Sequence, residues 1–204
     1  ALGDSGDTFT VPSGATIANN GTATGFGGGS WTLIKTQTVV QGDAVQSLDF
    51  VDGTSDVVFD ATYKIYKFLV YNWKPSAAVQ LKLRVKSGGS FATTGYITEN
   101  WRSYYSGASS DRASATDCIM LTRFDMNSGG STTTDIGMFE FLFSAPAVTQ
   151  YPQCMGLCSG GETGQMVISM GSGKLATSAA YTGVRFYIPS GNMEGEFSLY
   201  GITT

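Results

Sequence analysis

The side chains that could carry acid–base chemistry in this sequence are carboxylates, because histidine is absent. Histidine is the commonest general base and a member of the serine and cysteine hydrolase triads, so its absence excludes those schemes. Glycoside hydrolysis needs only two carboxylates. The candidates are Glu99, Asp111, Asp117, Asp125, Glu140, Glu194 and Glu196. None of them stands in a motif that assigns a role, so we expect no catalytic residues and no enzyme.

Cysteine adds little chemistry. Cys154 and Cys158 stand in CMGLC, and Cys118 lies alone upstream. An odd count of three is not the even framework of a small disulfide-rich domain, which favours free thiols. A zinc site would need a fourth ligand from a carboxylate, a water or another chain. The glycine run at 26–30 lacks the lysine of a phosphate-binding loop. We expect no metal and no cofactor.

The stretch YITENWRSYYSGASSDR, residues 96–112, offers flat apolar side chains beside polar ones. Such a mixture is typical of surfaces that contact a glycan or a protein. We predict that it is a loop whose binding residues are Glu99, Asn100, Trp101, Arg102, Tyr104 and Tyr105. Packing in the core or at a subunit interface is the alternative for the same aromatic residues.

The composition bounds the class of protein. The chain has 204 residues, of which only 14% are charged, against about 25% in typical globular domains. A surface so poor in charge is weakly protected against self-association, which favours an oligomer. The net charge of −4 comes without a basic run, so nucleic acid is not expected as a partner. No apolar stretch reaches the length of about 18 residues that membrane insertion requires.

The amino end lacks the basic and then apolar layout of a signal peptide. Either a signal has been removed or there was none.

Apolar residues recur mostly at period two, with glycine and serine turns between the runs. Residues 79–86, VQLKLRVK, alternate cleanly and predict a half-buried antiparallel strand. Strands are predicted at 31–40, 56–60, 63–73, 79–86, 117–124, 136–144, 165–170, 181–188 and 196–202. Residues 145–164 lack periodicity and predict a long surface loop. Together these features indicate an all-β, antiparallel β-sandwich of jelly-roll type.

The first thirty residues differ from the rest, because they contain no side chains large enough to build a core. Alone, such a segment could not offset its ordering entropy. We therefore expect residues 1–30 to be an extended arm, ordered by packing three copies around one axis and used for attachment to a particle. Gly27, Gly28 and Gly29 would form a hinge into the β-sandwich domain at 31–204.

Two segments resemble virion structural proteins of tailed bacteriophages. They are GDTFTVPSGATIANNGTATGFG near the amino end and YTGVRFYIPSGNMEGEFSLYGI at 181–202. The resemblance implies a trimeric surface component of the virion, such as a tail fibre, spike or capsid decoration, made in the host cytoplasm. It carries no catalytic residues. Its implied partners are two further copies of the chain, other virion proteins and a host-surface glycan.

We expect the second of these segments to form a hairpin that closes the sandwich. One face of the outgoing strand would be formed by Val184, Phe186 and Ile188. Phe197 and Leu199 of the return strand would pack against that face. Gly191 and Gly195 would permit a sharp or bulged connection.

A second hypothesis belongs to a different class of protein, a glycan-binding module that recognises a host-surface polysaccharide through residues 96–112. It is compatible with the first, because contact with a receptor is a common task of fibre ends.

Overall fold

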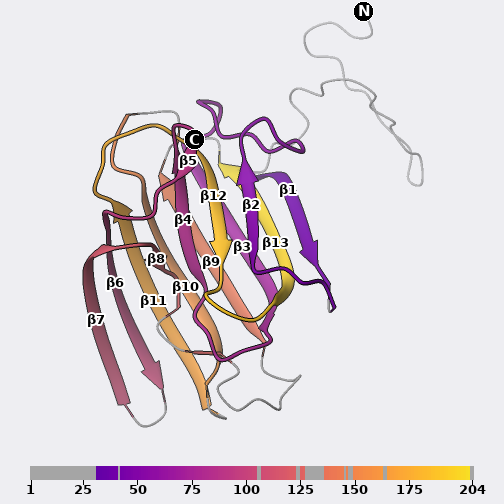
Figure 1. The fold of residues 1–204 in the computed structure, drawn as a ribbon, viewed down its shortest axis with the longest axis vertical. Coiled ribbons are helices and arrows are strands. Elements are labelled where there is room, and N and C mark those ends of the chain that lie inside the picture. Colours follow the sequence, from indigo (N-terminus) through magenta and orange to yellow (C-terminus); the bar gives the residue numbers. More distant parts are fainter. Residues whose placement is uncertain are drawn as a thin grey trace, which may run out of the picture.

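The computed structural model describes residues 31–40, 42–104, 107–122, 125–126, 136–144, 146, 149–162 and 165–202. The predicted arm and hinge lie outside this range, as does Tyr105. The described residues form thirteen strands in two antiparallel sheets (Figure 1), so the predicted all-β class is confirmed.

We call the two sheets the large and the small sheet. In spatial order, the large sheet contains β1 (Trp31–Val39), β13 (Met193–Ile202), β3 (Ile65–Pro75), β9 (Gly137–Ser144), β10 (Gln153–Glu162), β11 (Gln165–Leu175), β6 (Tyr96–Tyr104) and β7 (Gly107–Thr116). The small sheet contains β2 (Ser47–Val51), β12 (Tyr181–Tyr187), β4 (Lys82–Ser87) and β5 (Ser90–Phe91), and β8 (Ile119–Met120) also pairs with β4.

The core lies between the sheets and is rich in aromatic rings. Phe68 of β3 places its ring centroid 5.0 Å from that of Phe50 and 4.9 Å from that of Phe186, both of the small sheet. All three side chains are fully buried. Such edge-to-face pairs stabilise a core beyond the area they bury.

A bulge in β3 lets two residues three positions apart face the same core. Val70 and Trp73 are both buried, although strict alternation would place them on opposite faces. The register shifts between them, and Asn72 adopts a positive φ of 51°. Asparagine tolerates this conformation better than most side chains.

Most predicted strands are present with small changes in their bounds. The strand expected at 79–86 begins only at Lys82, and Val79 forms an isolated bridge with Met126. The strand expected at 117–124 is reduced to β8. The strand expected at 56–60 is wrong, because Ser55 and Asp56 have positive φ angles and turn the chain. The surface loop expected at 145–164 is also wrong, because residues 153–162 form β10.

The predicted carboxy-terminal hairpin is wrong in its pairing. Strand β12 lies between β2 and β4 in the small sheet, whereas β13 lies between β1 and β3 in the large sheet. The two strands therefore face each other across the core instead of sharing a ladder. The expected glycine geometry is confirmed, because Gly191 has a φ of 77° and Gly195 a φ of 145° at a register shift between β13 and β3.

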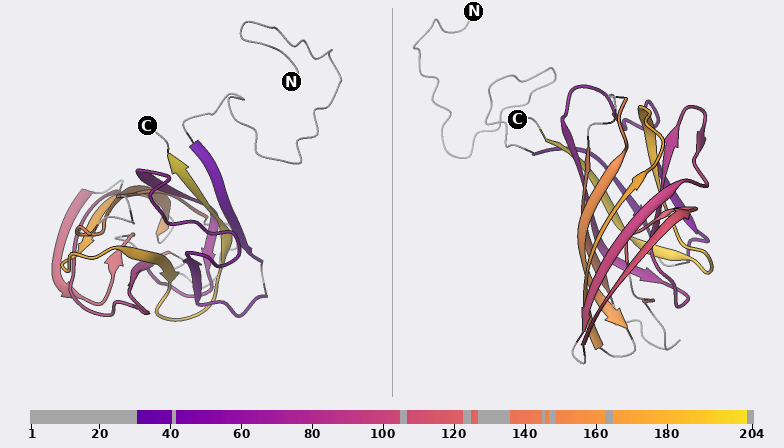
Figure 2. Two further views of the ribbon diagram at one scale, coloured as in Figure 1. Left: turned by 90° about the horizontal axis from the view of Figure 1, so that it is seen from above. Right: turned by 90° about the vertical axis from the view of Figure 1, so that its left-hand side faces the viewer.

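Two antiparallel strand pairs extend the large sheet beyond β9. One consists of β10 and β11, and the other of β6 and β7. The view from above shows that these strands continue the large sheet in a curve (Figure 2, left). The inner side of this extension is packed against β8, where Gly173 leaves room for the side chain of Ile119.

Candidate functional site

Five of the predicted binding residues, Glu99, Asn100, Trp101, Arg102 and Tyr104, lie on strand β6 and not on a loop. The side chains of Glu99 and Trp101 are exposed on the outward face of the large sheet, whereas Asn100 is buried on the inward face. Successive side chains of a strand point to opposite faces, so Asn100 cannot share one surface with Glu99 and Trp101. The Nε of Arg102 donates a hydrogen bond of 2.9 Å to the Ser109 hydroxyl of β7.

Tyr104 ends β6, and its side chain is outside the described part of the structure.

Asn100 has a structural role. Its Nδ2 donates to the Thr98 hydroxyl at 3.2 Å, and its Oδ1 has no partner among the described atoms. This oxygen lies so close to Gly171 that a Cβ there would collide with it. Asn100 is thus enclosed by β6 and β11 and is not available to a ligand on the outward face.

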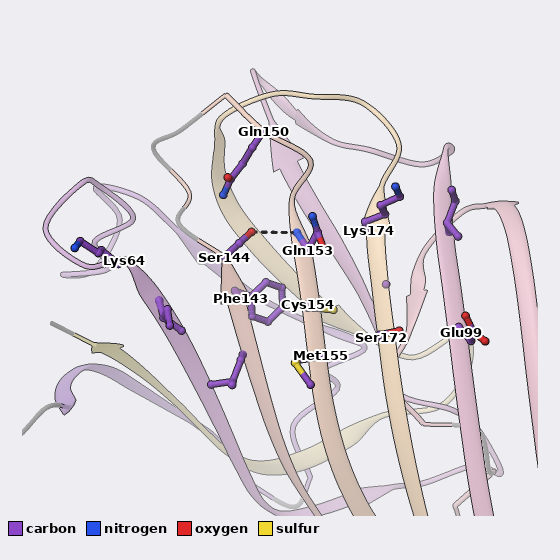
Figure 3. Close-up of a pocket in the computed structure, with 14 residues that line it drawn as sticks. Lys64, Glu99, Phe143, Ser144, Gln150, Gln153, Cys154, Met155, Ser172 and Lys174 are labelled. Atoms are coloured by element: carbon purple, nitrogen blue, oxygen red, sulfur yellow. Dashed lines mark hydrogen bonds between the residues drawn. The ribbon is translucent and has the colours of Figure 1, made fainter. Parts of the chain in front are cut away.

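A groove crosses the outward face where β3, β9, β10, β11 and β6 come together at one end of the large sheet (Figure 3). Its volume is about 980 Å³. Its apolar floor includes Ile65, Ile97, Leu142 and Met155, and its polar lining includes Lys64, Glu99, Ser144, Gln150, Gln153, Ser172 and Lys174. The register builds the floor, because Met155 of β10 stands opposite Leu142 of β9 and Ser172 of β11, which in turn stands opposite Glu99.

The polar side of the groove is partly organised by its own contacts. The backbone N–H of Gln153 donates to the Ser144 hydroxyl at 3.2 Å. The Lys174 ammonium lies 4.9 Å from the ring centroid of Tyr151. Glu99 is the one carboxylate among the described lining residues. Such a groove can bind an elongated ligand that has both apolar and hydroxyl-bearing faces.

Next to the groove the outward face carries exposed apolar side chains. We call this surface the apolar patch, and it comprises Met155, which also lines the groove, together with Trp101, Met138, Leu157, Met166, Ile168 and Met170. The exposed fraction of these side chains ranges from 43% for Trp101 to 71% for Met166. They are neighbours across strands, because Met170 stands opposite both Leu157 and Trp101. Contiguous apolar surface of this kind marks an interaction site in soluble proteins.

The cysteine thiols are buried, although Cys154 of β10 is among the residues that line the groove (Figure 3). Cys118, Cys154 and Cys158 are free and buried. Burial raises the pKa of the Cys154 and Cys158 thiols to about 12. These neutral thiols are therefore poor nucleophiles. Among the described residues, no group of three or more cysteine or acidic side chains could hold a metal ion.

Sequence reasoning missed most of the groove and patch because the strand β10 was not predicted. Its inward positions include Cys154, Gly156 and Cys158, and the small glycine is needed because a Cβ there would collide with Phe141. The available signal was the alternation of Met155 and Leu157 with these small residues. Four of the seven methionines lie on the outward face of the large sheet.

Comparisons with protein-family models, with curated proteins and with solved structures gave no match. In the part of the chain that the structure describes, no helix has the length and apolar character needed to cross a membrane. The function is therefore argued from the site and from the two end segments.

Proposed function

We propose that the protein is a non-enzymatic structural component of a tailed-bacteriophage virion, forming a trimeric fibre, spike or decoration on the particle surface. The observation that carries this proposal is the segment 181–202, which resembles the end of such proteins. In the fold this segment is central, because β12 pairs with β2 and β4, and β13 pairs with β1 and β3. The resembling residues thus specify the core of the domain, not a variable surface.

The strand order supports a jelly-roll β-sandwich as the architecture of this component. The eight strands β1, β2, β3, β4, β8, β9, β12 and β13 are taken as 1 to 8 along the chain. The large sheet then begins 1-8-3-6 and the small sheet contains 2-7-4-5. This alternation between sheets is the order produced by two Greek keys. The pairs β6–β7 and β10–β11 are insertions between β4 and β8 and between β9 and β12.

Residues 1–30 would form the axial contact of the trimer and its attachment to the particle. Mass spectrometry and immunogold labelling of purified phage particles test the location directly. We expect the chain in the particles, with labels on their surface. Absence of the chain from purified particles would refute the virion assignment.

A chain lacking residues 1–29 should fold but fail to join particles, and its normal incorporation would contradict the role of the arm.

The groove supports a second, compatible role, the binding of a host-surface glycan. Its apolar floor suits the faces of sugar rings, and Glu99, Gln153 and Lys174 can exchange hydrogen bonds with hydroxyl groups. The E99A and K174A variants should lower binding to host polysaccharide at least about tenfold, which corresponds to about 1.4 kcal/mol. The K82A variant, on the small sheet, is the matched control. Equal binding of the polysaccharide by all three variants would contradict a role of the groove in glycan binding.

A further inference from the structure

We infer that the apolar patch is buried between copies of this chain. The inference rests on the self-assembly in the proposed function, although not on the location in a virion, and it assigns the surface through which the folded domains meet. Strands β10 and β11 carry the centre of the patch, with Met155 and Leu157 on one strand and Met166, Ile168 and Met170 on the other.

The face has the dimensions that such contact needs. Its residues lie on four adjacent strands, β9, β10, β11 and β6. With a strand spacing of about 4.8 Å and about seven residues at about 3.3 Å each, the plane covers about 440 Å². Protruding side chains increase its accessible area toward the roughly 800 Å² per partner of a stable interface. The size of the patch is thus compatible with a contact between copies.

The charges on the face favour a second copy over a charged partner. Lys67 forms an ion pair with Glu140 and also lies 3.8 Å from the ring centroid of Trp31. Glu99 and Lys174 lie at the groove end. Glu140 stands opposite Leu157 and is paired with Lys67, and the described outward positions of β10 and β11 between Lys174 and Met166 are apolar or neutral. A copy of the same face therefore brings no unpaired like charge to the patch. A polyanionic partner would find no basic cluster there.

The methionines suit a surface that must fit against itself. Met138, Met155, Met166 and Met170 have flexible, polarisable side chains that adapt to irregular neighbours. Two copies of one rigid surface would rarely interdigitate by chance, whereas methionine side chains can rearrange at low cost. The groove lies at the end of the face, where its polar lining borders the contact and is open to solvent.

The test uses the full chain, its native mass and the oxidation of its methionines. Native mass is measured by light scattering at two protein concentrations, and peroxide oxidation is followed for each methionine by mass spectrometry. We expect an assembly in which Met155 and Met166 react at least tenfold more slowly than in a dissociated form. Met126 and Met193 are buried within the domain and serve as internal references that react slowly in both states.

The dissociated form comes from the double variant L157K/M170K. We expect its mass to fall to that of one chain, 21.5 kDa, with unchanged circular dichroism and rapid oxidation of Met155 and Met166. The control V40K introduces the same charge at an exposed apolar residue outside the patch and should assemble normally.

Three outcomes on the unmodified chain would overturn the inference. A monomer with reactive methionines means that nothing covers the patch, and an assembly with reactive methionines means that copies meet elsewhere. A monomer with protected methionines means that residues 1–30 cover the patch within one chain. Because these results need no variant, misfolding of L157K/M170K would not leave the question open. Detection of the chain in particles is independent of all three.

Discussion

Phe186 of β12 and Phe197 of β13 have ring centroids 5.3 Å apart, although their strands belong to different sheets. The hairpin prediction places these two residues on paired strands. In the structure they contact each other across the core, from strands of different sheets. The short connection between β12 and β13 therefore joins the two sheets, and the aromatic contact holds them together. The packing of Phe68 and Phe50 around Phe186 extends the same cluster.

Truncation of Phe186 should be strongly destabilising. The side chain is fully buried among other rings, and a Phe→Ala substitution at such a site costs about 3–5 kcal/mol of unfolding free energy. Denaturant unfolding of F186A followed by fluorescence measures this loss. V40A, at an exposed position, should change stability by less than about 0.5 kcal/mol. Similar small effects from both variants would contradict the central place of Phe186.

Gly195 should tolerate no side chain. Its φ is 145°, and a Cβ there would lie 3.0 Å from the Tyr71 carbonyl oxygen and 3.1 Å from the Trp73 Cα. We expect G195A to lose about 1–3 kcal/mol of stability through backbone strain, seen as a lower midpoint of thermal unfolding. At Gly89, a Cβ would have no neighbour within 4 Å. G89A should therefore leave the midpoint nearly unchanged, and an equal loss in both variants would rule out this account.

Stability should fall in alkaline solution. Burial raises the pKa of Tyr66 and Tyr96 to about 12, from the ordinary 10.0, and the unfolded chain releases these protons at lower pH than the folded chain. A group with a raised folded pKa stabilises fully below its unfolded pKa, and that stabilisation is lost as pH rises toward the folded pKa. Denaturant midpoints should therefore decrease between pH 9 and pH 12.

The Y96F variant separates this effect from general instability. The Tyr96 hydroxyl accepts a 2.8 Å bond from the Val85 N–H and donates a 3.1 Å bond to the Ala92 carbonyl. Y96F should be less stable than the parent at neutral pH but should lose less stability on going to alkaline pH. A parent protein with the same midpoint at pH 8 and pH 11 would disprove the assignment.

The cysteines of the folded protein should react only slowly with alkylating reagents. Cys154 and Cys158 are buried with a raised pKa, and alkylation requires an accessible thiolate. Iodoacetamide at pH 8 should label Cys154 and Cys158 at least about tenfold more slowly in the native chain than in urea, where all three cysteines should react. Rapid labelling of Cys154 in the native chain would mean that the β9–β10 ladder opens readily.

The alternation of apolar and polar residues predicted a strand correctly wherever large apolar side chains occupy its inward positions. Leu83 and Val85 of β4, and Phe139, Phe141 and Phe143 of β9, are of this kind. The same reasoning failed at β7, GASSDRASAT, which lies at the edge of the large sheet and has no large apolar residue. It failed at 56–60 because Val57 and Phe59 are buried from an irregular segment that follows a turn, so their spacing imitates a strand.

The site was harder to predict than the fold. Glu99 and Trp101 share the outward face, because residues two positions apart on a strand point to the same side. The prediction of a loop also includes Asn100 and Arg102, because alternation between two faces does not apply to a loop. Ile65, Leu142 and Met155 meet in the groove through ladder registers between distant strands. Local sequence contains no information on those registers.

The place of β12 and β13 also affects how the protein is made. In the described structure, β2 finds its ladder partner in β12 and β1 finds its partner in β13. While the ribosome is still synthesising residues 181–202, the strands β1 and β2 have left the exit tunnel without the neighbours they need. The nascent chain therefore cannot complete either sheet until its last strands emerge, and fragments from interrupted translation lack the folded surface through which copies would meet.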